Sequence, residues 1–116
     1  MNIVKFREII KERVRIANEC YNEWDYGIEQ CWKQEINLLT DDIPSTIDFL
    51  INECTADEYS WISEVIDDVA EQTGSREFVM CYKNLMEKFP EECKKYNIAG
   101  SVQFAEESLK GSDHNG

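Results

Sequence analysis

The sequence has little of what metal or disulfide chemistry needs. Its one histidine, His114, lies in a stretch rich in Gly, Ser, Asp and Asn, and its five cysteines include no Cys-x-x-Cys pair. An odd number of cysteines without a neighbouring histidine is typical of neither a disulfide framework nor a zinc site. A Cys–His nucleophilic pair would depend on that single histidine. We therefore expect no catalytic residue, no metal, no cofactor and no enzymatic activity.

Long hydrophobic runs are also missing. Charged residues interrupt positions 1–16 every two or three steps, so that this segment lacks the apolar region of a signal peptide. The longest apolar stretches span a few residues, far fewer than the ~20 that cross a bilayer. We expect a cytoplasmic protein that does not bind membranes.

Strand and loop signals are scarce. The chain has two prolines and five glycines, and its apolar residues recur every three or four positions, which indicates helices. A length of 116 residues allows one compact domain and excludes multi-domain enzymes. The predicted fold class is all-α, either a small helical bundle or a stack of αα-hairpins. We expect one helical domain over residues 1–110 and a polar tail over 111–116.

One apolar stripe keeps its helical phase from Ile3 to Leu39. A single helix of that length would measure about 55 Å, which a globule of this size does not cover. We therefore expect a break between Tyr21 and Gly27, with one long helix as the alternative.

Capping signals divide the middle of the chain. Acidic residues ahead of Pro44 predict a helix over 43–53. Thr55 with Glu58 forms a capping box, which opens a longer helix that ends at Gly74.

Two more helices are expected after Gly74. Ser75 is positioned to cap a helix that ends before Pro90, and the short connection predicts antiparallel packing against the preceding helix. A last helix is expected over 101–110.

Negative charge dominates the composition. The chain carries 24 acidic and 12 basic residues, a net charge of -12. Residues 1–20 hold five basic and three acidic side chains, whereas residues 21–60 hold one basic and ten acidic ones. Such a charge repels nucleic-acid phosphates and anionic membranes and attracts basic proteins. The bases near the N-terminus alternate with Glu8 and Glu12, and we expect them to pair along their own helix rather than to bind nucleic acid.

A helical wheel places four carboxylates of the expected 55–73 helix on one face, with an indole at its edge. Carboxylates steer and pair with a cationic partner, and an aromatic side chain anchors it. The alternative interpretation is a merely solvated acidic face with the indole partly in the core. The predicted partner-binding residues are Asp57, Trp61, Glu64, Asp68 and Glu71, assisted by Asp41, Asp42 and Asp48.

Six segments carry a resemblance to a known family: Glu23-Trp24, Asp41-Asp42-Ile43, Thr46 to Leu50, Cys54 to Glu64, Ser75 to Phe78 and Lys94 to Ile98. With them, residues 20–109 resemble small acidic helical immunity proteins of bacterial polymorphic toxin and contact-dependent growth inhibition systems. The resemblance implies a cytosolic antidote that binds a cognate toxin domain, often a basic nuclease, and blocks its active site or an adjacent surface. No specific binding residue carries over.

Two alternatives stay open at this point. An acidic adaptor or secretion chaperone would bind an effector and leave its activity intact. An enzyme that uses carboxylates and a metal would need converging pairs, but neighbours such as Asp67 and Asp68 diverge by about 100° on a helix.

Overall fold

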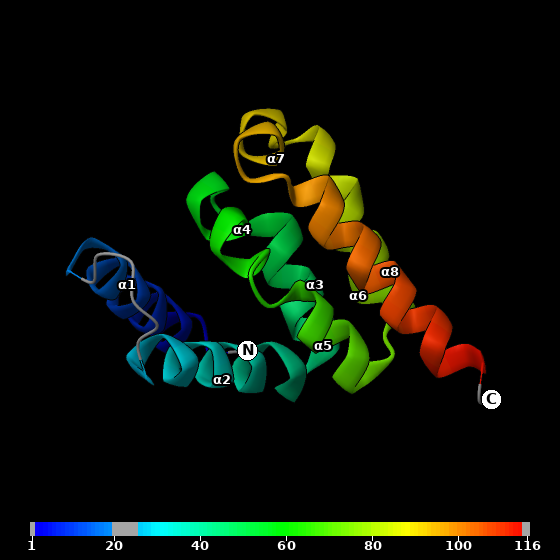
Figure 1. Ribbon diagram of the computed structural model, residues 1–116, viewed down its shortest axis with the longest axis horizontal. Coiled ribbons are helices and arrows are strands. Elements are labelled where there is room, and N and C mark those ends of the chain that lie inside the picture. The colour runs from blue at the N-terminus through cyan, green and yellow to red at the C-terminus, as the bar shows by residue number, and fades with distance from the viewer. Residues whose placement is uncertain (1, 20–25, 115–116) are drawn as a thin grey trace.

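The computed structural model describes residues 2–19 and 26–114, and every element in this part of the chain is helical, which confirms the all-α prediction. Figure 1 shows the helices packed into one body. They are α1 (Ile3–Glu19), α2 (Tyr26–Asp41), α3 (Ile43–Asn52), α4 (Ala56–Ile62), α5 (Ile66–Thr73), α6 (Arg76–Asn84), the 3₁₀ helix η1 (Leu85–Glu87), α7 (Pro90–Tyr96) and α8 (Ile98–His114).

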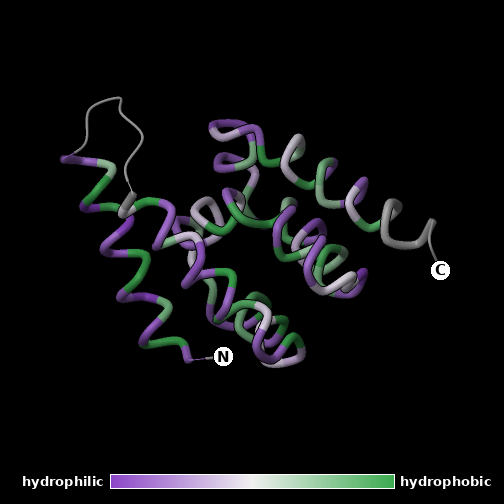
Figure 2. Tube along the Cα trace, turned by 60° about the horizontal axis from the view of Figure 1, so that its bottom comes forward, coloured by the Kyte–Doolittle hydropathy of each residue, from purple (hydrophilic) through white to green (hydrophobic). Residues whose placement is uncertain are grey.

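The main core lies where α4, α5, α6 and α8 meet. In Figure 1, α5 and α8 run side by side and α6 passes behind α8. Phe6 of α1, Leu39 of α2 and Phe49 of α3 also reach this core and are fully or almost fully buried. Hydrophobic and hydrophilic residues alternate along α1 in Figure 2, because only one side of that helix faces the body.

Two tyrosines join α4 to α6 inside the core. The Tyr59 hydroxyl donates to the Tyr82 carbonyl at 2.8 Å, and the Tyr82 hydroxyl donates to the Tyr59 carbonyl at 2.7 Å. Their rings stack with centroids 4.2 Å apart. Both phenol groups therefore lie in the apolar interior with their hydrogen bonds made, which removes the penalty of burying them.

The predicted helix starts are confirmed where a side chain caps the backbone. The Asp42 carboxylate accepts from the Ser45 amide at the start of α3. Thr55 and Glu58 form both bonds of the capping box of α4. Gly74 ends α5 with a φ of 63°, a left-handed conformation that glycine adopts without strain.

The stripe from Ile3 to Leu39 belongs to two helices, α1 and α2, and because these pack against each other they exclude the alternative of one long helix. The expected position of the break, between Tyr21 and Gly27, falls largely on residues that the structure does not describe. The connecting residues 20–25 lie outside the described part of the chain. Each helix carries part of the apolar stripe because α1 and α2 pack against each other and against the same core.

The prediction of a single helix from 55 to 73 is wrong, because a turn at 63–65 separates α4 from α5. There the amides of Glu64 and Val65 bond to carbonyls three residues back. The Ser60 and Ser63 hydroxyls also donate to the Asp57 and Ser60 carbonyls, at 2.6 and 2.5 Å. Serine hydroxyls that occupy backbone carbonyls in this way favour tightening or bending of a helix.

The C-terminal elements differ from the prediction as well. The helix that starts after Ser75 ends at Asn84, and a 3₁₀ turn follows it. Pro90 begins an additional helix, α7, in whose first turn the missing amide hydrogen costs nothing. The last helix starts at Ile98 instead of 101, and it extends to His114, four residues into the expected tail.

We predict that Tyr82→Phe lowers the free energy of unfolding by about 1–2 kcal/mol, because it leaves a buried carbonyl without its donor. Urea unfolding followed by circular dichroism measures the change. The control is Tyr96→Phe at a half-exposed position, which should change the midpoint little. Equal effects of the two variants would contradict a structural role of the tyrosine pair.

Candidate partner-binding site

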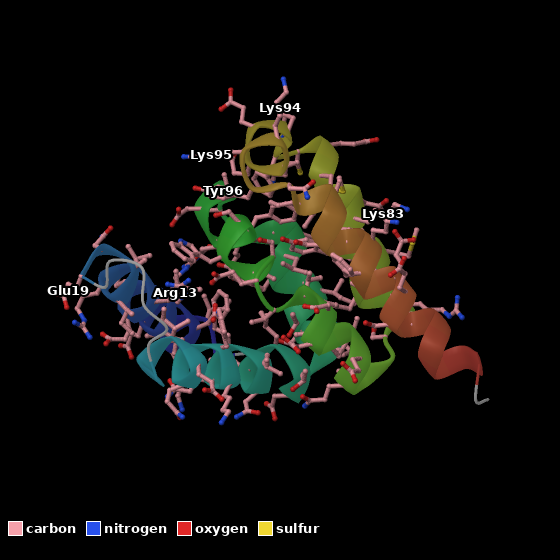
Figure 3. The ribbon with its side chains drawn as sticks, in the orientation of Figure 1. Arg13, Glu19, Lys83, Lys94, Lys95 and Tyr96 are labelled. Carbon is pink, nitrogen blue, oxygen red and sulfur yellow. The ribbon has the colours of Figure 1, made fainter. Side chains whose placement is uncertain are left out.

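Arg13 of α1 is a buried arginine, with only 9% of its surface exposed. Its Nε lies 3.1 Å from Oε1 of Glu64, and its Nη2 lies 2.7 Å from Oε2. This is the bidentate geometry in which guanidinium and carboxylate bind each other best. Figure 3 shows Arg13 in the space between α1 and α4.

Two indoles complete the surroundings of Arg13. The guanidinium carbon lies 4.9 Å from the ring centroid of Trp61 and 6.0 Å from that of Trp32. The Trp32 Nε1–H also donates to Glu64 at 3.2 Å. Trp61 is therefore held by a cation–π contact with α1 while part of it stays exposed.

Glu35 of α2 is a buried acid next to this cluster. It has no exposed surface, and neither of its carboxylate oxygens has a hydrogen-bond partner among the described residues. Nη1 of Arg13 is likewise buried without a partner there. Burial, assisted by the charge of Glu64 and opposed by the charge of Arg13, raises the pKa of Glu35 to about 8. Near neutral pH Glu35 is therefore largely protonated.

A second ion pair joins α1 to α4. Nε of Arg7 lies 2.8 Å from the largely buried Glu58 carboxylate, and its Nη2 donates to the Glu53 carbonyl at 3.3 Å. The expectation that the N-terminal bases pair along their own helix is therefore wrong for Arg7 and Arg13. It is confirmed for Arg15, which pairs with Glu12 and, at 2.5 Å, with Glu19.

A cleft opens on the other side of Trp61. It has a volume of about 320 Å³ and is lined by Ser60, Trp61, Ser63, Glu64, Tyr96 and Ser101. A second hollow of about 280 Å³ shares Ser60 and Tyr96 and adds Ala56, Asp57, Glu92 and Lys95. Figure 3 shows Lys95 and Tyr96 at the edge of α7 that borders this region. We call the two hollows together the Trp61 cleft.

The structure distributes the eight predicted partner-binding residues over several surfaces. Asp57, Trp61 and Glu64 line the Trp61 cleft. Asp68 and Glu71 lie exposed one turn apart on α5, where partial burial and the charges of Asp67 and Glu71 raise the pKa of Asp68. The other three are also exposed: Asp41 ends α2, Asp42 caps α3, and Asp48 accepts from the Asn52 amide.

The predicted single face of Asp57, Glu64, Asp68 and Glu71 is therefore wrong. A helical wheel holds only within one continuous helix, and the turn at 63–65 interrupts it. Glu64 lies in that turn and is directed to Arg13, while Asp57 belongs to the preceding helix.

Sequence reasoning missed Arg13, Trp32, Glu35 and Tyr96. A signal for two of them was present. Arg13 follows Ile9 by four residues, and Glu35 lies four residues from both Cys31 and Leu39, so that each charge occupies a position of the buried stripe. A charged residue at a buried position of a helix either reaches the surface through a local distortion of the helix or is paired with another group inside the protein.

We predict that Arg13→Ala lowers the free energy of unfolding by about 2–4 kcal/mol, because it leaves the Glu64 carboxylate without its cation and uncovers Trp61. Chemical unfolding, followed by tryptophan fluorescence, measures it. Arg15→Ala is the control, since that exposed arginine pairs only within α1, and it should change stability little. A comparable loss in both variants would mean that α1 is stabilised by helix propensity alone.

A second prediction concerns the pH dependence of stability. Because the folded pKa of Glu35 is raised to about 8, the folded state holds its proton more tightly than the unfolded state does. The free energy of unfolding should then fall as pH rises from 5 to 8, with a contribution from Glu35 on the order of 3 kcal/mol. Glu35→Gln should lack this contribution, whereas Glu71→Gln, at an exposed position, should keep it. Parallel pH profiles of Glu35→Gln and the unchanged protein would refute the assignment.

Comparison with known proteins gives no further guidance: no family model, curated protein or solved structure matches the chain. Among the helices that the structure describes, none is long and apolar enough to cross a membrane. Within the same residues, no group of three or more His, Cys, Asp or Glu side chains is placed to hold a metal ion.

Proposed function

We propose that the protein is an immunity protein, which binds a cognate basic nuclease toxin domain and neutralises it by stoichiometric occlusion. The observation that carries the proposal is the Trp61 cleft. It combines two partly exposed aromatic side chains, Trp61 and Tyr96, with carboxylates at its margin, on a chain with a net charge of -12.

The charge of the body favours this kind of partner. The two arginines of α1 that face the body are neutralised by Glu58 and Glu64. Within the described residues, the exposed Asp57, Asp68 and Glu71 take part in no ion pair. Their field therefore extends into solvent, where it accelerates the approach of a basic protein.

The cleft suits a lysine or arginine side chain of that partner. Glu64 is already paired with Arg13, so that Asp57 and Glu92 supply the remaining negative charge and outnumber Lys95, the one cation that lines the same hollow. Trp61 and Tyr96 supply apolar contact area, while Arg13 and Lys95 of the same chain already lie over their rings, at 4.9 and 5.3 Å from the ring centroids. A nuclease holds phosphate with such cations, and covering them would block its substrate.

The decisive experiment uses the product of the gene adjacent to the one for this protein. If this protein is an antidote, it should abolish the nuclease activity of that gene product when the two purified proteins are mixed at equimolar ratio. An adaptor or secretion chaperone would form the complex and leave the activity intact, and that outcome would overturn the proposal.

We also predict that association is fast and sensitive to salt, since long-range attraction between opposite charges is screened by ions. Stopped-flow measurement of the association rate at increasing salt concentration should show a steep decrease. A rate that does not change with salt would remove the argument from charge.

The cleft itself is tested by substitution. Asp57→Lys and Tyr96→Ala should each weaken the complex by about tenfold or more, as expected for central contacts. Glu107→Lys, at an exposed position of α8, makes the same charge change outside the cleft and is the control. If it weakens binding as much as Asp57→Lys does, only net charge matters and the cleft is not the docking site.

A further inference from the structure

Another hollow, separate from the two that form the Trp61 cleft, lies between α3 and α6. It has a volume of about 380 Å³ and is lined by Ile47, Ile51, Glu77, Met80, Cys81, Asn84 and Leu85. It shares no lining residue with the cleft. In the view of Figure 1, α3 and α6 lie behind α4 and α8. We call this hollow the α3–α6 groove.

The groove leaves large apolar side chains in contact with solvent. Ile51 is 53% exposed and Met80 is 49% exposed, although α3 and α6 pack together beneath them. Their neighbours Ile47, Cys81 and Leu85 are partly buried and border the main core. Exposed apolar side chains grouped along a groove are typical of a docking surface, and methionine adapts to varied partners.

The one charged side chain among the residues that line the groove is the carboxylate of Glu77. Asp48, an exposed residue of α3, follows Ile47 in the sequence without lining the groove. No lysine or arginine lines it: Lys83 of α6 pairs with Glu106 of α8, and Arg76 lines a neighbouring hollow, which it shares with Met80. A partner that fills this groove therefore gains from positive charge and loses from negative charge.

The shape of the groove favours a helix as its occupant. Its lining residues recur once per turn on both sides, at 47 and 51 on α3 and at 77, 80–81 and 84–85 from α6 into η1. Ridges with this spacing accept the side chains of a third helix at i, i+3, i+4 and i+7. At 1.5 Å per residue, the ten residues of α3 match about three turns of such a helix.

We propose that the α3–α6 groove binds a basic amphipathic helix of a partner protein, with its apolar face on Ile51 and Met80 and its cations toward Glu77 and Asp48. A second copy of the chain is the other conceivable occupant. Its net charge of -12 opposes that pairing. The groove is a separate surface from the Trp61 cleft, so that its role does not depend on toxin neutralisation.

The probe for the test is a fluorescein-labelled peptide of leucine and lysine, about four helical turns long, with leucines at i, i+3, i+4 and i+7. Fluorescence anisotropy measures its affinity for the full chain. A peptide with the same residues in scrambled order, which has no apolar face, controls for attraction by charge alone. The ordered peptide should bind at least about tenfold more tightly.

Three matched variants locate the binding. Ile51→Lys and Met80→Lys place a cation in the groove and should each weaken peptide binding about tenfold or more. Phe104→Lys makes the same change at an apolar side chain of α8 that is 64% exposed and lines none of the described hollows, and it should leave affinity within about twofold. Circular dichroism confirms that each variant is folded.

Cys81 provides a readout inside the groove. Its thiol is free and partly exposed, and burial with the nearby Glu77 charge raises its pKa, so that alkylation is best followed at alkaline pH. Bound peptide should slow alkylation of Cys81 and not of Cys93, a free and partly exposed thiol outside the groove.

Three results would overturn the proposal. The first is equal affinity for the ordered and the scrambled peptide. The second is loss of affinity in Phe104→Lys to the same extent as in the groove variants. The third is a dimer in sedimentation experiments that Ile51→Lys dissociates, because the groove would then be occupied by a second copy. None of them bears on inhibition through the Trp61 cleft, which is measured with a different partner and different variants.

Discussion

The ion pair between Arg13 and Glu64 is the contact on which the arrangement of α1 and of the Trp61 cleft depends. Removing a guanidinium and a carboxylate from water costs several kcal/mol for each ion, and only close geometry with further hydrogen bonds offsets this. Here the pair is bidentate, the Trp32 indole donates to the same carboxylate, and Trp61 covers the guanidinium. The same contacts fix the indole that forms one wall of the cleft. Fold and candidate site therefore share one interaction.

Helix limits set by a local chemical signal were predictable from the sequence. Asp42, Thr55 with Glu58, and Gly74 act through hydrogen bonds or backbone angles within a few residues, and each has the predicted role. The turn at 63–65 was not predicted, because the apolar positions on either side of it, Ile62 and Ile66, stay in helical register. Periodicity reports which residues are buried, and it does not report whether the backbone between them is continuous.

The candidate site was predictable only in part, for the same physical reason. Trp61 and Glu64 are indeed adjacent to a cation, but the cation is Arg13 of the same chain. Pairing between residues 51 positions apart is a tertiary contact, and no local pattern encodes it. What the sequence did contain was a charge in the buried register of two helices, Arg13 in α1 and Glu35 in α2. Two such charges of opposite sign, on helices that follow each other in the chain, are a usable sign of a buried polar cluster.

Because the carboxylates are distributed over several surfaces, steering of a partner and direct contact with it involve different carboxylates. Steering depends on the summed field of the molecule, so that Asp41, Asp48 and Glu71 contribute to it wherever they lie on the surface. Docking depends on the side chains that contact the partner. We place these contacts in hollows where apolar or aromatic side chains lie beside a charged one. The Trp61 cleft offers this combination to a single cationic side chain, and the α3–α6 groove offers it to a helical face. An acidic chain with two such hollows would attract a basic protein from any direction and bind it in few orientations, which is what the proposed inhibition of a basic toxin requires.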